Sequence, residues 1–220
     1  MKKIAIVAGG ELDESLLDRI KQSELIIGVD RGAWWLFSRN VKPTIAIGDF
    51  DSISEGQLEV LKKAQIPIKK YSKEKNETDL ELAVVLACQE KPERIEIFGA
   101  IGSRLDHSLA GVSFLASCLE KNIPARIVTK TSELTLFSRN VTVSKNNQYT
   151  YLSLLPWTQE ICVSITGCKY YGKDVLIKRG ESRGVSNEIV GKEAQIEISS
   201  GIALLIQVTV QSPDTPARRS

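Results

Sequence analysis

The sequence predicts an α/β N-terminal domain with a mostly parallel sheet, followed by an all-β C-terminal sandwich. Up to residue 131, short apolar runs alternate with segments whose apolar residues recur at helical spacing, as in repeated βα units. Beyond it the helical periodicity stops, and short apolar runs follow one another between polar or glycine-containing turns. We therefore expect domains at 1–131 and 132–210. Residues 211–220 carry two prolines and no apolar periodicity, which predicts a disordered tail.

The individual elements follow from the same patterns. In the first domain the predicted strands are 3–7, 24–28, 44–47, 66–70, 94–98 and 125–128. The predicted helices between them are 12–20, 33–37, 55–64, 79–88 and 105–120. In the second domain the predicted strands are 133–137, 148–155, 161–165, 175–177, 195–198 and 203–210.

Composition narrows the class of partner. The formal charge of +2, from 29 basic and 27 acidic side chains, is too balanced for a dedicated nucleic-acid or membrane-surface binder. Four cysteines without a CxxC pair and a single histidine do not make a zinc site, so we expect reduced, mostly buried thiols. No apolar run approaches the ~20 residues of a membrane helix, and the charged start lacks the apolar region of a signal peptide. These features predict a cytoplasmic protein whose partners are small molecules.

Aspartates recur where the predicted strands end. Asp30 follows the second strand, Asp49 and Asp51 follow the third, and Asp106 follows the fifth, while Asp79 opens the helix after the fourth. Ligands of open α/β sheets bind beyond the carboxyl ends of the strands. Taken singly, each aspartate is better explained as a helix cap or turn residue. Their common position makes coincidence a weaker explanation and predicts a shared site.

The Asp49-Phe50-Asp51 segment is a candidate metal site. If it is extended, both carboxylates project on one side and Phe50 points back into the core, because side chains alternate along a strand. Magnesium in phosphoryl-transfer sites is typically held by one or two carboxylates and the phosphates themselves. The spacing therefore predicts a seat for a metal and its phosphate ligands.

The start of the helix at residue 79 has two interpretations. Thr78 and Glu81 match a capping box, and we assign both residues mainly to that role. Asp79 lies in the first turn, where it favours the helix dipole and also projects toward the other carboxylates. A structural and a functional role are equally supported for Asp79.

A glycine-containing segment precedes the helix at residue 105. Gly99 and Gly102 allow the backbone to approach an anion, and Arg104 can contact a phosphate through two hydrogen bonds. His107 has no second histidine or catalytic serine to join, so we interpret it as a packing or hydrogen-bonding residue. Neither a GxGxxG nor a GxxxxGK[ST] motif is present, which disfavours ordinary dinucleotide and P-loop sites.

Taken together, these motifs resemble those of the thiamine pyrophosphokinase family. The resemblance spans nearly the whole chain, and the order and spacing of the motifs are specific although each motif alone is weak. One departure is Trp34-Trp35, where aliphatic residues or tyrosine are expected, and we interpret the pair as packing residues. The matching segments are 28–33, 43–52, 78–79, 102–107 and 182–188.

The resemblance implies transfer of a diphosphoryl group from ATP to the hydroxyl of thiamine, with Mg²⁺ as cofactor and AMP as the other product. It also implies an N-terminal domain that binds ATP and magnesium, a C-terminal thiamine-binding domain, and homodimers whose active sites use both subunits. The implied roles are metal binding for Asp49, Asp51 and Asp79, catalysis for these three with Arg104 and Asp106, nucleotide binding for Asp30, Arg31, Thr78 and Gly102, and thiamine binding for Ser186, Asn187 and Tyr170.

Charge arithmetic supports the metal, because ATP beside several carboxylates is repelled unless cations intervene. Either Asp79 or Asp106 could accept the proton of the thiamine hydroxyl, and the sequence does not choose between them. Two alternatives stay open. One is a metal-dependent hydrolase of nucleotides or phosphate esters that uses the same aspartates, and the other is a thiamine- or nucleotide-binding regulatory module without turnover.

Overall fold

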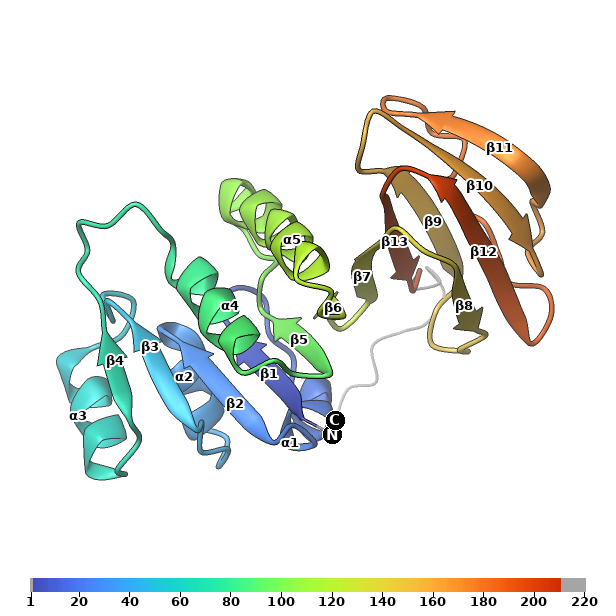
Figure 1. Cartoon of the computed structure of the whole chain (residues 1–220). Coiled ribbons are helices and arrows are strands. Elements are labelled where there is room, and N and C mark those ends of the chain that lie inside the picture. The colour runs from blue at the N-terminus through green and yellow to red at the C-terminus, as the bar shows by residue number, and fades with distance from the viewer. Residues whose placement is uncertain (1, 211–220) are drawn as a thin grey trace. The chain divides into compact units, whose positions relative to one another are not determined.

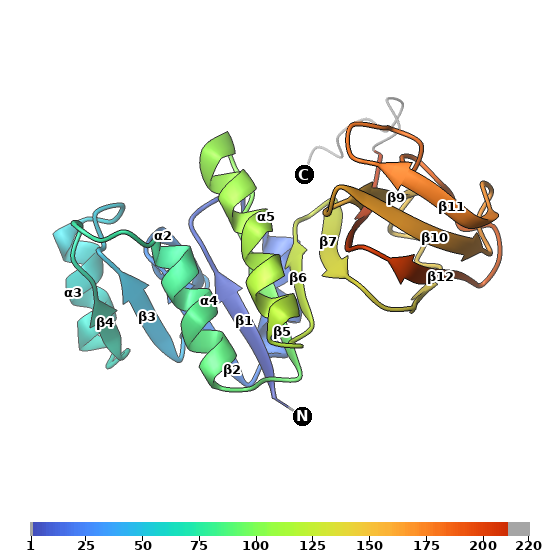
Figure 2. The ribbon, with the colours of Figure 1, turned by 45° about the horizontal axis from the view of Figure 1, so that its top comes forward.

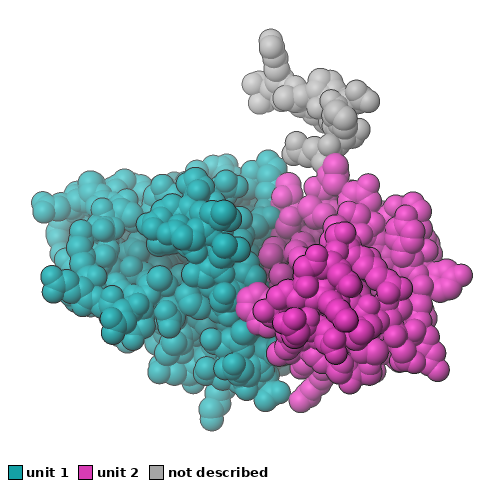
Figure 3. All heavy atoms as spheres, turned by 90° about the horizontal axis from the view of Figure 1, so that it is seen from above, with its two compact units in different colours: residues 1–130 teal, residues 131–220 magenta. Residues whose placement is uncertain are grey.

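The computed structural model describes residues 2–210. The chain forms two compact units, Met1–Lys130 and Thr131–Ser220, coloured teal and magenta in Figure 3. The tail predicted at 211–220 lies outside the described residues. Within them, no helix is both long and apolar enough to cross a membrane.

The first unit is built on six parallel strands in the order β4-β3-β2-β1-β5-β6. The central strand β1 is completely buried from Ile4 to Val7, as expected where helices cover both faces of a parallel sheet. The strands are β1 (Lys3–Val7), β2 (Leu25–Val29), β3 (Ile45–Gly48), β4 (Ile68–Lys70), β5 (Arg94–Phe98) and β6 (Ala125–Val128).

Helices cover the two faces of this sheet. Figures 1 and 2 show α4 and α5 in front of the strands and α1 and α2 behind them. Behind the sheet, Ile20 of α1 and Leu36 of α2 pack against Ala5, Val7 and Phe98. The elements are η1 (Glu14–Leu16), α1 (Leu17–Lys21), α2 (Arg31–Phe37), α3 (Glu55–Lys63), α4 (Asp79–Gln89) and α5 (Leu105–Glu120).

The described part of the second unit, residues 131–210, has strands and no helices, and the strands form two antiparallel groups. One group has the order β7-β13-β9 and the other β11-β10-β12-β8. Inward-facing residues of both groups, such as Leu152, Val163 and Ile196, share one buried core, as in a sandwich. The strands are β7 (Ser132–Phe137), β8 (Val141–Ser144), β9 (Tyr151–Pro156), β10 (Glu160–Thr166), β11 (Gly172–Lys178), β12 (Glu193–Ser200) and β13 (Ala203–Val208).

The predicted fold class is confirmed, with local differences. Strand β8 was not predicted because its four residues alternate in burial and hold only two apolar side chains. The helix expected at 12–20 is a 3-10 turn followed by one short helix, and the turn begins where the Asp13 side chain accepts a hydrogen bond from the N–H of Ser15. Trp34 and Trp35 pack against the core, as expected. The four cysteines are free, and three of them are buried.

Candidate functional site

A pocket of about 610 Å³ lies at the carboxyl ends of the central strands of the first unit. The strand order reverses at β1, whose neighbours are β2 on one side and β5 on the other. Where the strand order reverses, the loops that follow the two adjacent strands run in opposite directions, and a crevice forms between them. Residues following β1, β2, β3 and β5 and the first turns of α4 and α5 line the pocket.

Three carboxylates converge in this pocket. Asp30 follows β2, Asp49 follows β3, and Asp79 is the first residue of α4. One carboxylate oxygen from each of the three lies within 4.8 Å of the other two. Oxygen ligands of this kind suit a hard divalent cation such as Mg²⁺. The helix start also confirms the capping role of Thr78, whose hydroxyl accepts a hydrogen bond from the N–H of Glu81 at 3.2 Å.

Asp30 is held in place by contacts with the segment at the end of β3. Its backbone has φ 46° and ψ −120°, a strained conformation for a residue with a side chain. The N–H of Phe50 donates to its Oδ1 at 3.0 Å. Gly48 makes room for the carboxylate, because a Cβ at that position would lie 1.9 Å from Asp30 Oδ1. The strain and the close approach place the Asp30 carboxylate beside Asp49 and Asp79.

The electrostatics of the cluster reflect its crowding. Burial, together with the negative charges of Asp79 and Asp49, raises the pKa of Asp30 to about 7, although the hydrogen bond from Phe50 opposes the rise. Lys75 lies beside the cluster, with Nζ 2.7 Å from Asp79 Oδ1. Burial disfavours its charge, but the hydrogen bond to Asp79 and the attraction of the carboxylates raise the pKa of Lys75.

The expected geometry of Asp49 and Asp51 is wrong, because the segment is a turn. Phe50 has φ 62°, in the left-handed region, while its side chain is buried as predicted. The N–H of Asp51 donates to Asp49 Oδ1 at 2.9 Å. Asp51 lines the pocket but does not belong to the group of three carboxylates. Its side chain is exposed and forms an ion pair with Lys73 at 3.2 Å. Asp30, rather than Asp51, completes the group of three converging carboxylates.

The other side of the pocket has a glycine-rich backbone. Gly99 has φ 66°, and Gly10 approaches the carbonyl groups of Gly99 and Ile101 too closely for any Cβ. Gly102 lines the pocket, and its N–H donates to the hydroxyl of Ser108 at 3.1 Å. These close approaches bring main chain, rather than side chains, to the pocket wall.

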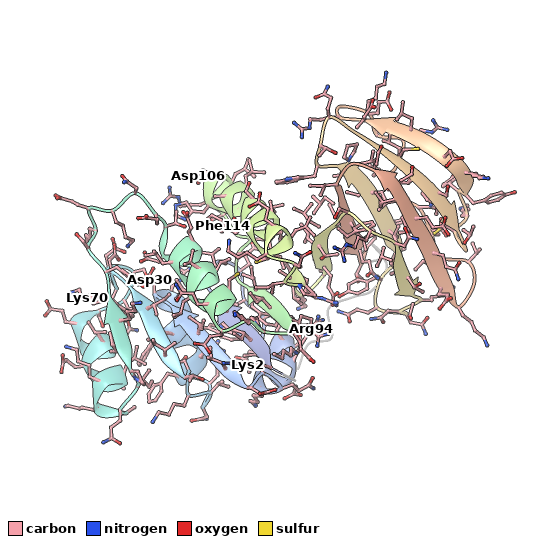
Figure 4. The ribbon with its side chains drawn as sticks, viewed as in Figure 1. Lys2, Asp30, Lys70, Arg94, Asp106 and Phe114 are labelled. Atoms are coloured by element: carbon pink, nitrogen blue, oxygen red, sulfur yellow. The ribbon has the colours of Figure 1, made fainter. Side chains whose placement is uncertain are left out.

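Cationic and imidazole side chains line the rim. Arg31 lines the pocket and donates to the Gly9 carbonyl. Arg104 also lines it and pairs with Asp106 at 2.6 Å, both side chains being about two-thirds exposed. Asp106 is outside the pocket lining, and Figure 4 shows it at the start of α5, apart from Asp30. His107 is exposed and lines the pocket, and the packing or hydrogen-bonding role expected for it stays a prediction.

Sequence reasoning missed some pocket residues. Gly9, Gly10 and Glu11 follow β1 and line the pocket. The rule that located the aspartates, the end of a parallel strand, could have found these three. Lys75 lies in a loop without periodicity, and no sequence signal pointed to its contact with Asp79.

The second unit has a pocket of its own, of about 380 Å³. Tyr170, Arg183 and Asn187 line it, and the Tyr170 side chain is 63% exposed. Asn187 is buried and accepts hydrogen bonds from the N–H groups of Tyr170 and Glu188, both at 2.9 Å, and donates to the Tyr170 carbonyl at 2.6 Å. Its amide therefore fixes the loop that carries Tyr170.

Ser186 differs from its neighbour Asn187. It has φ 59° and is exposed, and its N–H donates to the hydroxyl of Ser153 at 3.0 Å. The lining of the second-unit pocket includes Asn187 but not Ser186. The structure therefore brings two of the three residues assigned to thiamine, Tyr170 and Asn187, to this pocket.

Two family models match the chain in succession. Residues 16–127 match the catalytic domain of thiamin pyrophosphokinase, and residues 139–203 match its vitamin B1 binding domain. The chain is 33% identical to the thiamine pyrophosphokinase of Bacillus subtilis over 213 residues, which cover 95% of this chain and all of that protein.

Solved structures give the same result. The crystal structure of the Bacillus subtilis enzyme superposes with a TM-score of 0.89 at 32% identity, covering 94% of this chain and 99% of the other. The thiamin pyrophosphokinase of Geobacillus thermodenitrificans superposes with a TM-score of 0.86 at 31% identity, covering 96% and 99%.

Proposed function

The chain belongs to the thiamin pyrophosphokinase family, and we propose that each of its two pockets binds one of the two substrates. The protein is an ATP-dependent kinase that makes thiamine diphosphate, and its substrates are thiamine and ATP. The pocket of the first unit receives the phosphate chain of ATP, and the pocket of the second unit receives thiamine. The convergence of Asp30, Asp49 and Asp79 on one point carries this assignment.

Mg²⁺ is the cation we assign to these carboxylates, and the donor set fits it. The three residues offer oxygen ligands only, and the cluster lies beside a pocket large enough to hold a polyphosphate. Asp49 and Asp79 are direct ligands in this proposal, with Asp30 as the third. Asp51 contributes negative charge at the rim. When bound, the cation neutralises charge on the phosphates and holds them in a fixed orientation.

The residues of the chain supply positioning and charge for the transfer. The hydroxyl oxygen of thiamine attacks the β-phosphorus, the bond from that phosphorus to the α-phosphate oxygen breaks, and AMP leaves. Arg31 and Arg104 line the rim, where their guanidinium groups can bind phosphate oxygens. Asp106 is paired with Arg104 and lies outside the pocket lining, which favours Asp79 as the group that accepts the hydroxyl proton.

The thiamine site and the assembly form the second part of the proposal. The exposed ring of Tyr170 can cover the thiamine heterocycle, while Asn187 acts by holding the Tyr170 loop. We also propose a homodimer in which each active site combines the first unit of one subunit with the second unit of the other. The requirement for ATP supports a cytoplasmic location.

Product analysis tests the function directly. With thiamine, ATP and Mg²⁺, we expect thiamine diphosphate and AMP in equal amounts, and removal of Mg²⁺ by EDTA should stop the reaction. AMP should form only when thiamine is present, which separates the kinase from a hydrolase. Formation of ADP with thiamine monophosphate would contradict the proposed attack at the β-phosphorus.

A further inference from the structure

Lys75 forms a shielded ion pair at one residue of the carboxylate cluster, Asp79. Its Nζ lies 2.7 Å from Asp79 Oδ1 and 3.1 Å from the Ser72 carbonyl. The Lys75 and Asp79 side chains are only 13% and 17% exposed. The ammonium group also lies 5.8 Å from the centroid of the Tyr71 ring. The positive charge is thus mostly shielded from water and lies beside Asp79, which lines the pocket.

A neighbouring lysine provides a contrast within the same loop. Lys73 pairs with Asp51 at 3.2 Å, but those side chains are 67% and 51% exposed. An exposed pair of this kind contributes little to stability and is screened by salt. The Lys75 pair is more shielded, and its ammonium is attracted by Asp49 and Asp30 as well as by Asp79. Lys75 therefore acts on the whole cluster, whereas Lys73 acts on one rim carboxylate.

The location of this charge conflicts with a bound divalent cation. Lys75 occupies one oxygen of Asp79, a residue to which we assign metal binding, and like charges at this range repel strongly. The same site also has to receive the negative phosphates of ATP. A lysine has a flexible stem and a compact ammonium group, so Lys75 can leave Asp79 and follow the phosphate charge.

We propose that Lys75 is a positioning residue that neutralises the aspartates while no metal is bound, and that its ammonium moves to the phosphates when metal and ATP enter. The proposal rests on the proposed function of the pocket. It requires that Lys75 oppose the metal when no nucleotide is present and support the nucleotide once the metal is bound. Loss of the charge should therefore shift the two affinities in opposite directions.

The test uses Lys75→Met, which keeps an unbranched apolar stem and removes the charge. Mn²⁺ binding to the nucleotide-free protein is followed by electron paramagnetic resonance, and binding of a non-hydrolysable ATP analogue at saturating Mn²⁺ is followed by calorimetry. We expect Mn²⁺ to bind about tenfold more tightly and the analogue about tenfold more weakly, as expected for one lost charge in a partly screened site. Lys73→Met is the matched control and should change each affinity less than about twofold.

Other outcomes would overturn the proposal. If both affinities fall, Lys75 only anchors the loop before α4, and if neither changes, the pair has no role in charge balance. Circular dichroism spectra that match the wild type identify a folded variant, and Lys75→Arg, which retains the charge, should keep wild-type affinity for the analogue. If wild-type protein binds no Mn²⁺, the metal site itself is wrong and the role of Lys75 fails with it. If wild-type protein binds Mn²⁺ but the opposite shifts are missing, only the role of Lys75 fails.

Discussion

Replacing Asp30 with asparagine should stabilise the protein at alkaline pH while it abolishes activity. Asparagine has nearly the same shape and can still accept the hydrogen bond from the N–H of Phe50. It cannot carry the negative charge that burial and the neighbouring carboxylates disfavour. Activity should be lost because the third proposed metal ligand is gone.

The pKa of Asp30 gives the sign and size of the effect. It is raised from 3.8 to about 7 in the folded state. Below pH 3.8 both the folded and the unfolded protein carry the proton, whereas between 3.8 and about 7 only the folded protein does. The free energy of unfolding therefore falls as pH rises through this window and stays lower above it. The full difference between the two pKa values corresponds to roughly 4 kcal/mol. Because Asp30 is only partly buried, solvent screening reduces this free energy to about 2 kcal/mol.

Urea unfolding in EDTA at pH 5 and pH 8 measures this difference. Every protein compared carries Trp157→Phe, so that the fluorescence of Trp34 and Trp35 reports on the first unit. At pH 8 the Asp30→Asn variant should be more stable than the wild type by about 2 kcal/mol, and at pH 5 much of that difference should vanish. The exposed Asp51 provides the control for the stability measurement. The Asp51→Asn variant should be as stable as the wild type at both pH values. A variant that is destabilised equally at both pH values would refute the argument.

Two further predictions concern the second unit. Asn187→Ala removes both hydrogen bonds that the Asn187 side chain makes to the Tyr170 backbone, so steady-state kinetics should show the KM for thiamine raised about tenfold, with the KM for ATP unchanged. A change confined to ATP would contradict the assignment of this pocket. Mixing that variant with Asp49→Asn at limiting thiamine should give roughly a quarter of wild-type activity, because half the dimers are mixed and each has one intact site. Mixtures that, despite verified subunit exchange, show no more than the residual activity of the Asn187→Ala chains would place the whole site in one chain.

Strand positions were predictable from the sequence because burial on both faces demands continuous apolar runs. The residues of β1 and β5 are examples, and their bounds match the prediction. The aspartates could be located for a related reason, since they follow those runs. Strand β8 was not predicted, because a short strand with one buried face shows little hydrophobic periodicity in the sequence.

Side-chain geometry was less predictable. The positive φ of Phe50, which removes Asp51 from the carboxylate group, depends on how the turn packs after β3. The partner of Asn187 is the backbone of Tyr170, which no local pattern connects to it. The contact between Lys75 and Asp79 likewise depends on the path of a loop. In each case tertiary contacts, rather than local propensity, determine the geometry.

The central place of β1 has a consequence for synthesis. Its apolar residues, such as Ile4 and Ile6, pair with β2 on one edge and with β5 on the other. β2 emerges soon after β1, but β5 begins only at Arg94. Because chains are synthesised at roughly 5–20 residues per second, one edge of β1 stays unpaired for several seconds before β5 has been made. An apolar edge left open for that time can pair with another nascent chain, so the ribosome-bound intermediate is the stage at which we expect this fold to be most prone to aggregation.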